Sequence, residues 1–279
     1  MLDADTQAHY RELAARLALR CRTTRCPLIG LNGAQGSGKS TAAAFLAAEL
    51  ASRHGLTAAV LSIDDFYLPR ADRQRLAAQV HPLFITRGVP GSHDVALGVA
   101  TLQAVRALGA GHPLALPRYS KADDDRLPET RWPRLEGPVD LILFEGWCVG
   151  TPAQDDAALE TPVNALEADE DRDGRWRRQV NAQLAGPYAE WFAGLDALIY
   201  LQVPNFDAVH RWRWQQEQDT ARSAGKKAAG LQTPEQLARF IQHYQRLSQH
   251  ALDVLPDRAD VVIRLRDDHG VEAVRYRSG

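Results

Sequence analysis

The chain is poor in cysteine, has no long apolar run and carries almost no excess of charge, and each absence excludes a class of protein. Its three cysteines, Cys21, Cys26 and Cys148, have no second Cys/His pair with metal-type spacing, which argues against a structural zinc site. Sparse, odd-numbered cysteines are typical of reduced thiols, so we expect a cytoplasmic protein. No stretch approaches the roughly 20 apolar residues of a membrane span. A formal net charge of -2 gives no support to a general nucleic-acid or membrane partner.

What is present is close to the average composition of a soluble globular protein. The chain has 279 residues, of which 45% are hydrophobic and 24% charged. We expect a single domain over residues 1–279, with an N-terminal helix within 1–25, an acidic, irregular surface loop at 151–175 and a lid helix at about 205–225. The sequence leaves the oligomeric state open.

The most informative segment is Gly33-Ala-Gln-Gly-Ser-Gly-Lys-Ser40, which fits the P-loop pattern Gly-x4-Gly-Lys-Ser. A short apolar strand precedes it and a run of helix formers follows it, which is the context that this motif requires. Glycines let the backbone curl closely around a ligand, and the N–H groups of the turn and of the helix start bind phosphate. Lys39 reaches the outer phosphates of a nucleotide and the Ser40 hydroxyl holds Mg2+. The predicted nucleotide-binding residues are therefore Gly33, Ala34, Gln35, Gly36, Ser37, Gly38, Lys39, Ser40 and Thr41, with ATP and Mg2+ as the cofactors.

Apolar strands alternate with helices along the rest of the chain. Candidate strands lie at 26–32, 57–63, 113–117, 139–144 and 197–203, with two more from residue 260 on, and helices are expected at 8–20, 94–108, 176–192, 205–221 and 233–250. This order predicts an α/β three-layer sandwich with a mostly parallel central sheet and helices on both faces. Ligands bind such sheets at the carboxyl ends of the strands. The P-loop, Asp64, Arg118 and Glu145 are expected at such ends.

Two neighbouring carboxylates, Asp64 and Asp65, follow the second strand. A carboxylate that faces the phosphates could accept a proton from an attacking hydroxyl, a role that typically contributes ~100 to 10,000-fold in rate. The alternative is that these residues cap or turn the segment after the strand. We assign Asp64 as the candidate base, while the choice between it and Asp65 stays open.

Glu145 ends the most apolar strand of the chain. A carboxylate at this place can organise Mg2+ together with Ser40, and the alternative is a simple strand-end cap.

Further polar residues cluster around predicted strand ends. Gly91-Ser-His-Asp94 is compatible with a ligand-binding turn or, equally, with Asp94 as a helix cap. Arg118-Tyr-Ser-Lys121 could grip a small anionic, hydroxylated substrate, or could lie on a solvated surface beside acidic neighbours. The candidate substrate-binding residues are Asp65, Tyr67, His93, Asp94, Arg118, Tyr119 and Lys121.

The helix after Asn205 carries His210-Arg-Trp-Arg-Trp214. Arg211 and Arg213 could act as lid cations on the phosphoryl group in transfer, and the alternative is the solvated side of a helix whose tryptophans pack inward.

Taken together, these motifs resemble the phosphoribulokinase, uridine kinase and pantothenate kinase superfamily of P-loop kinases, and within it the D-glycerate 3-kinase family. The resemblance covers roughly residues 27–250. It rests on the P-loop and on Ser62-Ile-Asp-Asp-Phe-Tyr67, Gly88-Val-Pro-Gly-Ser-His-Asp94, Leu116-Pro-Arg-Tyr-Ser-Lys121, Phe144-Glu-Gly-Trp147 and Trp212-Arg-Trp-Gln-Gln-Glu217. It implies transfer of the ATP γ-phosphate to the 3-hydroxyl of D-glycerate, with Asp64 at the position of the base, Glu145 at the acidic strand end and Arg211 or Arg213 from the lid. The chain departs from the plant-type pattern after Tyr119, where its polar loop is short.

Three other functions remain open on the residues alone. The first is a kinase of another metabolite, such as uridine or pantothenate. The second is a regulatory NTPase, although the guanine-reading Asn-Lys-x-Asp motif is absent from the sequence. The third is a nucleotide-dependent nucleic-acid binder that uses the arginines of 172–178 and 211–213, against which the net charge argues.

Overall fold

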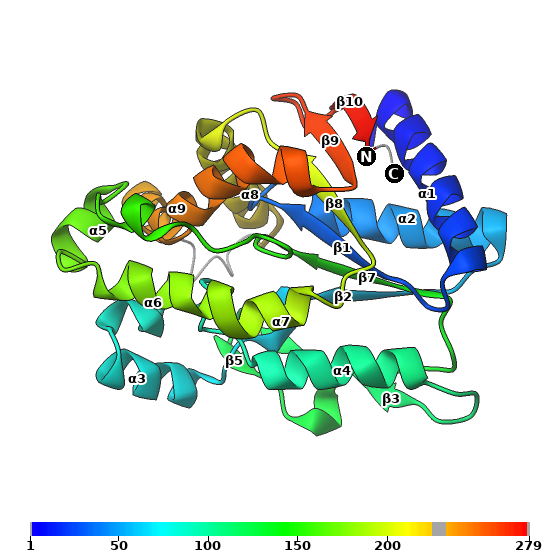
Figure 1. The fold of residues 1–279 in the computed structure, drawn as a ribbon, viewed down its shortest axis with the longest axis horizontal. Helices are drawn as coiled ribbons and strands as arrows, with labels where there is room; N and C mark the ends of the chain where they lie inside the picture. The colour runs from blue at the N-terminus through cyan, green and yellow to red at the C-terminus, as the bar shows by residue number, and fades with distance from the viewer. Residues whose placement is uncertain (1, 225–232, 278–279) are drawn as a thin grey trace.

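The computed structural model describes residues 2–224 and 233–277. A six-stranded sheet with the order β10-β9-β8-β1-β7-β2 forms its centre (Figure 1). The pairs between β8, β1, β7 and β2 and between β8 and β9 are parallel, and β10 is antiparallel to β9. The central strands are β1 (Leu28–Gly33), β2 (Ala58–Ser62), β7 (Leu141–Gly146), β8 (Ala197–Gln202), β9 (Val261–Leu265) and β10 (Val271–Tyr276). The predicted α/β class with a mostly parallel sheet is confirmed.

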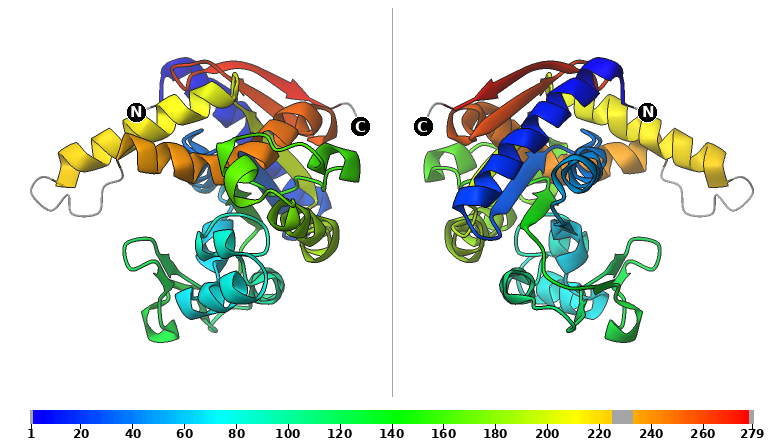
Figure 2. Two further views of the ribbon diagram at one scale, coloured as in Figure 1. Left: turned by 90° about the vertical axis from the view of Figure 1, so that its left-hand side faces the viewer. Right: turned by 90° about the vertical axis from the view of Figure 1, so that its right-hand side faces the viewer.

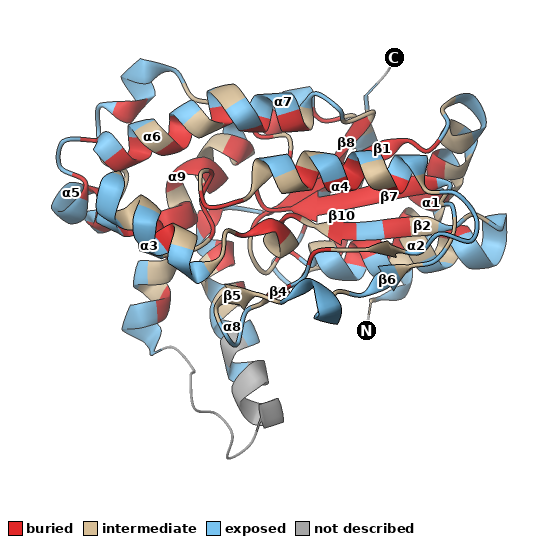
Figure 3. Ribbon diagram, turned by 90° about the horizontal axis from the view of Figure 1, so that it is seen from below, coloured by how far each residue is buried: buried red, intermediate tan, exposed pale blue. Residues whose placement is uncertain are grey.

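Helices cover both faces of this sheet, so its central strands are buried on both sides. All six residues of β1 and of β7 are buried, and Figure 3 shows the strands in red between helices that are buried on one side only. One face packs against α1 (Ala4–Thr23), α2 (Lys39–His54) and the start of α8 (Phe206–Ala224). The other packs against α4 (Val95–Ala107), α6 (Arg175–Gln183) and α7 (Ala189–Phe192). The long helix α9 (Pro234–Arg258) contributes to both cores.

Several local predictions are confirmed by the caps of these helices. The helix expected at 233–250 corresponds to α9, where Thr233 and Gln236 form a capping box with Pro234 at the first helical position. The carboxylate of Asp94 accepts a hydrogen bond from the Leu97 N–H and so caps α4.

A smaller lobe lies below the sheet, in cyan to green in Figure 2, and is built from residues that follow β2. It contains a 3-10 turn η1 (Ile63–Phe66), α3 (Arg70–Gln79), the 3-10 turn η2 (Pro82–Ile85) and α4. Two short antiparallel pairs complete it: β3 (Leu114–Ala115) with β6 (Arg134–Leu135), and β4 (Tyr119–Ser120) with β5 (Asp125–Arg126). A 3-10 turn η3 (Glu129–Arg131) connects β5 to β6.

The expected strand 113–117 is therefore not part of the central sheet. Proline has no backbone N–H to donate to a ladder, and Pro113 and Pro117 leave only Leu114–Ala115 free to pair. The prediction that Arg118 follows a strand of the parallel sheet was wrong, although the residue still reaches the site from its hairpin.

Two further expectations need correction. The helix expected at 176–192 is interrupted by a π-helical turn η5 (Leu184–Tyr188) that contains Pro187. The segment 151–175 contains a 3-10 turn η4 (Asp156–Leu159) and helix α5 (Ala165–Glu170), and its Glu167 and Asp171 are fully buried. The segment lies largely at the surface, but it is not irregular, and two of its acidic side chains are buried because they pair with arginines from other helices.

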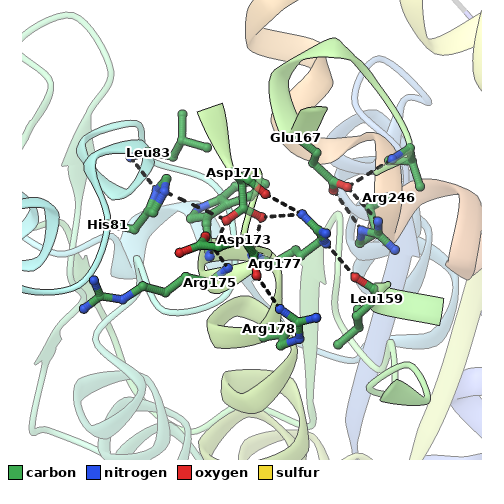
Figure 4. A network of polar contacts seen from close by, with 12 residues as sticks. His81, Leu83, Leu159, Glu167, Asp171, Asp173, Arg175, Arg177, Arg178 and Arg246 are labelled. Atoms are coloured by element: carbon green, nitrogen blue, oxygen red, sulfur yellow. Dashed lines mark hydrogen bonds and ion pairs between the residues drawn. The ribbon is translucent and has the colours of Figure 1, made fainter. Parts of the chain in front are cut away.

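The buried charges of this segment form the network in Figure 4. Glu167 pairs with Arg246 of α9 at 2.6 Å, and Asp171 pairs with Arg177 of α6 at 3.0 Å. Arg246 also donates to the carbonyls of Ala158 and Thr161. These contacts join α5 to α6 and α9.

The predicted lid region corresponds to α8, and residue 225 at its expected end lies outside the described residues. Figure 2 shows α8, in yellow, extending away from the body. No helix within 2–224 or 233–277 combines the length and apolar character needed to cross a membrane.

Candidate active site

The P-loop adopts the conformation that its glycines allow. Gly36 and Gly38 have φ values of 79° and 85°, a left-handed region that other residues rarely adopt. A Cβ on Gly33 would lie 2.6 Å from Ser37 Oγ, so the loop is closed too tightly for a side chain there. The Ser37 hydroxyl is buried without a partner in the structure. A tight turn with an unsatisfied buried hydroxyl at the start of α2 suits the phosphates of a nucleotide.

Lys39 and Ser40 are the first two residues of α2. Lys39 Nζ donates to the Ala34 carbonyl at 3.0 Å, which folds the side chain back over the loop. Burial lowers the pKa of Lys39, and the charges of Glu145 and Asp64 oppose this shift. Gln35 and Thr41 complete the predicted nucleotide-binding segment. Lys39 therefore contacts the loop, and its charge interacts with the two carboxylates that the sequence singled out.

Glu145 belongs to the neighbouring strand, where it lies between Leu31 of β1 and Ser62 of β2. Its Oε1 accepts a hydrogen bond from Ser40 Oγ at 3.0 Å. The structure thus brings together the two residues predicted to hold Mg2+. In residues 2–224 and 233–277 there is no cluster of three or more His, Cys, Asp or Glu side chains suited to a metal. A hydroxyl and one carboxylate fit Mg2+, which binds few protein ligands and keeps water and substrate phosphates as the others.

Asp64 lies in η1, directly after β2 at the same edge of the sheet. Its Oδ1 accepts a hydrogen bond from the Tyr67 hydroxyl at 2.8 Å, and its Oδ2 accepts one from Lys121 Nζ at 2.6 Å. Burial raises the pKa of Asp64, but Lys121 and Tyr67 outweigh burial and the net shift is downward. Asp64 is therefore ionised at neutral pH, as a proton acceptor must be.

Asp65 points elsewhere. Its carboxylate accepts from the Arg118 guanidinium at 3.1 Å and from the Tyr119 backbone N–H at 3.2 Å, so it holds the start of the β4–β5 hairpin against η1. Burial raises the pKa of Asp65, and Arg118 acts in the opposite direction. Between the two neighbouring carboxylates, Asp64 is the one whose charge acts on Lys39 of the P-loop.

His93 forms a small aromatic group with two tyrosines behind Asp64. Its ring stacks on Tyr67 with centroids 4.5 Å apart, and its Nδ1 lies 2.6 Å from the Tyr188 hydroxyl. Its Nε2 is buried without a partner. Burial lowers the pKa of His93 to about 3, with Asp64 acting in the opposite direction, so the ring is neutral at physiological pH. The group fixes the ring of Tyr67, whose hydroxyl binds Asp64.

Two other predicted substrate residues have their polar groups engaged inside the lobe. Asp94 binds the Leu97 N–H with one oxygen and Arg126 at 3.1 Å with the other, which supports its interpretation as a helix cap. The Tyr119 hydroxyl binds Arg73 at 2.8 Å and Asp124 at 2.9 Å. Both residues shape the wall of the site from behind.

Sequence reasoning missed Arg73, which is fully buried and organises this wall. Its guanidinium donates to the carbonyls of Leu68, Ile85 and Asp124 and pairs with the Asp124 carboxylate at 2.9 Å. The segment Arg70–Gln79 has three arginines and no apolar stripe, so nothing local marks Arg73 as the buried one.

The start of α8 lies directly on the P-loop. A Cβ on Gly36 would be 3.0 Å from Trp212 Cβ, and Trp212 is buried with its ring stacked on His269 at 4.1 Å. The two candidate lid cations diverge from here. Arg211 pairs with Asp267 in the β9–β10 turn, whereas Arg213 donates to the side chain of Gln216 on its own helix.

Comparison with known proteins adds sequence and fold relatives. No family model matches the chain. It is 32% identical over 230 residues to the uncharacterized kinase mug58 of Schizosaccharomyces pombe, and the alignment covers 78% of each chain. It is 33% identical over 198 residues to the chloroplastic D-glycerate 3-kinase of Arabidopsis thaliana, which covers 68% of this chain but only 41% of that protein. The solved structure of D-glycerate 3-kinase from Cryptococcus neoformans superimposes with a TM-score of 0.76 at 22% identity, over 99% of this chain and 100% of that one, and this likeness shows the fold.

Proposed function

The chain belongs to the D-glycerate 3-kinase family of P-loop small-molecule kinases, and from this premise we propose that it transfers the γ-phosphate of ATP to the 3-hydroxyl of D-glycerate. The products would be ADP and 3-phosphoglycerate. One observation carries the proposal: Asp64, a half-buried carboxylate whose charge acts on the P-loop lysine, is bound by Lys121, the kind of cation that an anionic, hydroxylated acceptor needs.

The nucleotide half of the site follows from the P-loop. The backbone of residues 33–38 and Lys39 would hold the outer phosphates, and Ser40 and Glu145 would hold Mg2+. When bound, Mg2+ supplies charge neutralisation for the phosphate oxygens.

The acceptor half supplies the base. The acceptor hydroxyl attacks the γ-phosphorus, the bond between that phosphorus and the β,γ-bridging oxygen breaks, and ADP leaves with the electron pair. The carboxylate of Asp64 takes the proton of the acceptor hydroxyl. The Tyr67 hydroxyl, which donates to Oδ1 of Asp64, holds this carboxylate in its orientation. Positioning of the two reactants contributes most of the remaining rate enhancement.

Cations on both sides of the site complete it. Lys39 from the P-loop and Arg213 from α8 would balance the charge that develops on the phosphoryl group, while Arg211 is held away by Asp267. Lys121 and Arg118 would bind the acceptor carboxylate from the β4–β5 hairpin. We also propose that α8 moves as a lid over the P-loop when both substrates are bound.

The bulk properties support the rest of the proposal. A net charge of -2 and three free cysteines suit a cytoplasmic enzyme with a small-molecule substrate and no nucleic-acid partner.

Coupled measurement of ADP release tests this function. The purified chain is incubated with Mg-ATP and separately with D-glycerate, L-glycerate, pantothenate, uridine, ribulose 5-phosphate or no acceptor. Stimulation by D-glycerate above all others, with NMR of the product showing phosphate on carbon 3, is the expected result. Stimulation by another acceptor alone, or hydrolysis that ignores every acceptor, would overturn the glycerate assignment.

A further inference from the structure

Both oxygens of Asp64 accept hydrogen bonds from side chains of the chain itself. Tyr67 occupies Oδ1 at 2.8 Å and Lys121 occupies Oδ2 at 2.6 Å. A carboxylate that accepts a charged hydrogen bond is a weaker proton acceptor, because that bond stabilises its ionised form. In this conformation the two hydrogen bonds therefore lower the affinity of the proposed base for a proton.

The two contacts differ in how easily they can be broken. Tyr67 is buried, stacked on His93 and close to Tyr119, so its hydroxyl is fixed in place. The Lys121 side chain is 63% exposed, and within the described residues the pair with Asp64 is its only hydrogen bond. A lysine has a flexible four-carbon stem and an ammonium that can turn to a new partner. Lys121 is the movable one of the two.

The hairpin that carries Lys121 does not depend on this contact. Asp65 binds Arg118 and the Tyr119 N–H at its start, and Asp124 binds Arg73 and Arg87 at its end. The ammonium can leave Asp64 without loss of the hairpin.

We propose that Lys121 is a charge-sensing latch on the base: it holds Asp64 until the carboxylate of the acceptor takes its ammonium, and only then is Oδ2 free to accept the acceptor's hydroxyl proton. This rests on the proposed kinase function. The chemical step is unchanged: the acceptor oxygen bonds to phosphorus, the bridging P–O bond breaks with its electron pair going to ADP, and the proton passes to Asp64.

The latch has two consequences. Water carries no negative charge to draw Lys121 away, so ATP hydrolysis without an acceptor is suppressed. A neutral polyol has the hydroxyl but lacks the carboxylate, so it is phosphorylated poorly even when it occupies the site. Electrostatics supports this direction, since Lys121 is the strongest of the influences that lower the pKa of Asp64 against the opposing effect of burial.

The test compares three variants with the wild type. Lys121→Met removes the ammonium and keeps the stem, Lys121→Arg keeps the charge, and Arg75→Met removes an exposed arginine that pairs with Asp72 on α3. Two quantities are measured: ATP hydrolysis without an acceptor, and the ratio of kcat/KM for D-glycerate to that for glycerol.

In Lys121→Met we expect acceptor-free hydrolysis to rise ~10-fold or more, because the base contributes ~100-fold or more once it is free. We expect the glycerate-to-glycerol ratio to fall ~10-fold or more, because a charge-assisted hydrogen bond to the acceptor is lost. Arg75→Met should stay close to the wild type in both. Lys121→Arg keeps the positive charge, so its acceptor-free hydrolysis should stay below that of Lys121→Met.

Unchanged or reduced hydrolysis in Lys121→Met would overturn the latch, even if KM for D-glycerate rises, because Lys121 would then be a binding residue alone. The measurement of ATP hydrolysis contains no acceptor. It therefore tests the role of Lys121 even if the wild-type protein is inactive with D-glycerate. That second result would instead refute the proposed acceptor.

Discussion

Removal of the Arg246 guanidinium should destabilise the protein more than any other single loss of charge on α9. Arg246 is buried, binds both oxygens of Glu167 at 2.8 and 2.6 Å, and donates to two backbone carbonyls at 2.7 Å each. In Arg246→Met the buried Glu167 carboxylate keeps, among residues 2–224 and 233–277, only the Val163 N–H as a partner. The substitution therefore leaves a buried charge without its counter-ion.

The expected magnitude follows from that geometry. Loss of one partner of a buried ion pair costs about 3–5 kcal/mol. For a chain of this size each kcal/mol lowers Tm by about 2 °C, so the fall should be about 6–10 °C. Removing the charge of the partner as well, in Arg246→Met/Glu167→Gln, should restore part of the loss because no uncompensated charge remains.

Urea unfolding followed by tryptophan fluorescence measures these free energies. The matched control is Arg239→Met, which makes the same substitution on the same helix and breaks a pair with Glu170 of the same partner helix, but in an exposed position. An exposed pair contributes about 0–1 kcal/mol, so the control should barely change. Equal effects of the two substitutions, or a double variant worse than Arg246→Met, would refute the reasoning.

Three further predictions concern the site. Asp64→Asn should lower kcat ~100-fold or more and leave the Kd for Mg-ATP nearly unchanged, and a loss of kcat below about threefold would show that another group is the base. Glu145→Gln should raise the Mg2+ concentration for half-maximal activity ~10-fold, and an unaltered Mg2+ titration would remove Glu145 from the metal site. Burial lowers the pKa of His93 from 6.5 to about 3, so between these values the unfolded chain binds a proton that the folded chain does not. The free energy of unfolding should therefore fall with decreasing pH across this window, by up to about 1.4 kcal/mol per pH unit from this residue, and His93→Gln should reduce the slope in urea titrations; an identical slope would show that His93 protonates without unfolding.

The relation between sequence and structure differs for the two halves of the site. The nucleotide half was predictable because its chemistry is carried by contiguous residues. The P-loop needs glycines at fixed spacing and a helix start directly after them, and Gly36 and Gly38 adopt the positive φ values that this requires. Parallel strands end at one edge, so Asp64 and Glu145 could be expected near Lys39 once the strands were recognised, and the structure places them so.

The acceptor half was only partly predictable, because its contacts join residues that are far apart in the sequence. Asp64 and Asp65 are adjacent and chemically alike, yet one binds Lys121 and the other anchors the hairpin through Arg118. A one-residue step in a 3-10 turn changes the direction of the side chain, and no local pattern shows what lies on each side.

By itself, the sequence determined the α/β class, the P-loop, the helix caps and the strand-end carboxylates, since each depends on backbone preferences and periodicity within a short segment. Only the tertiary structure decided which charges are buried. The acidic segment 151–175 looked solvated, but Glu167 and Asp171 are buried because Arg246 and Arg177 arrive from other helices. The free-energy cost of burying a carboxylate is offset by an arginine that is close in the fold but distant in the sequence. No local pattern in the sequence shows which arginine this is.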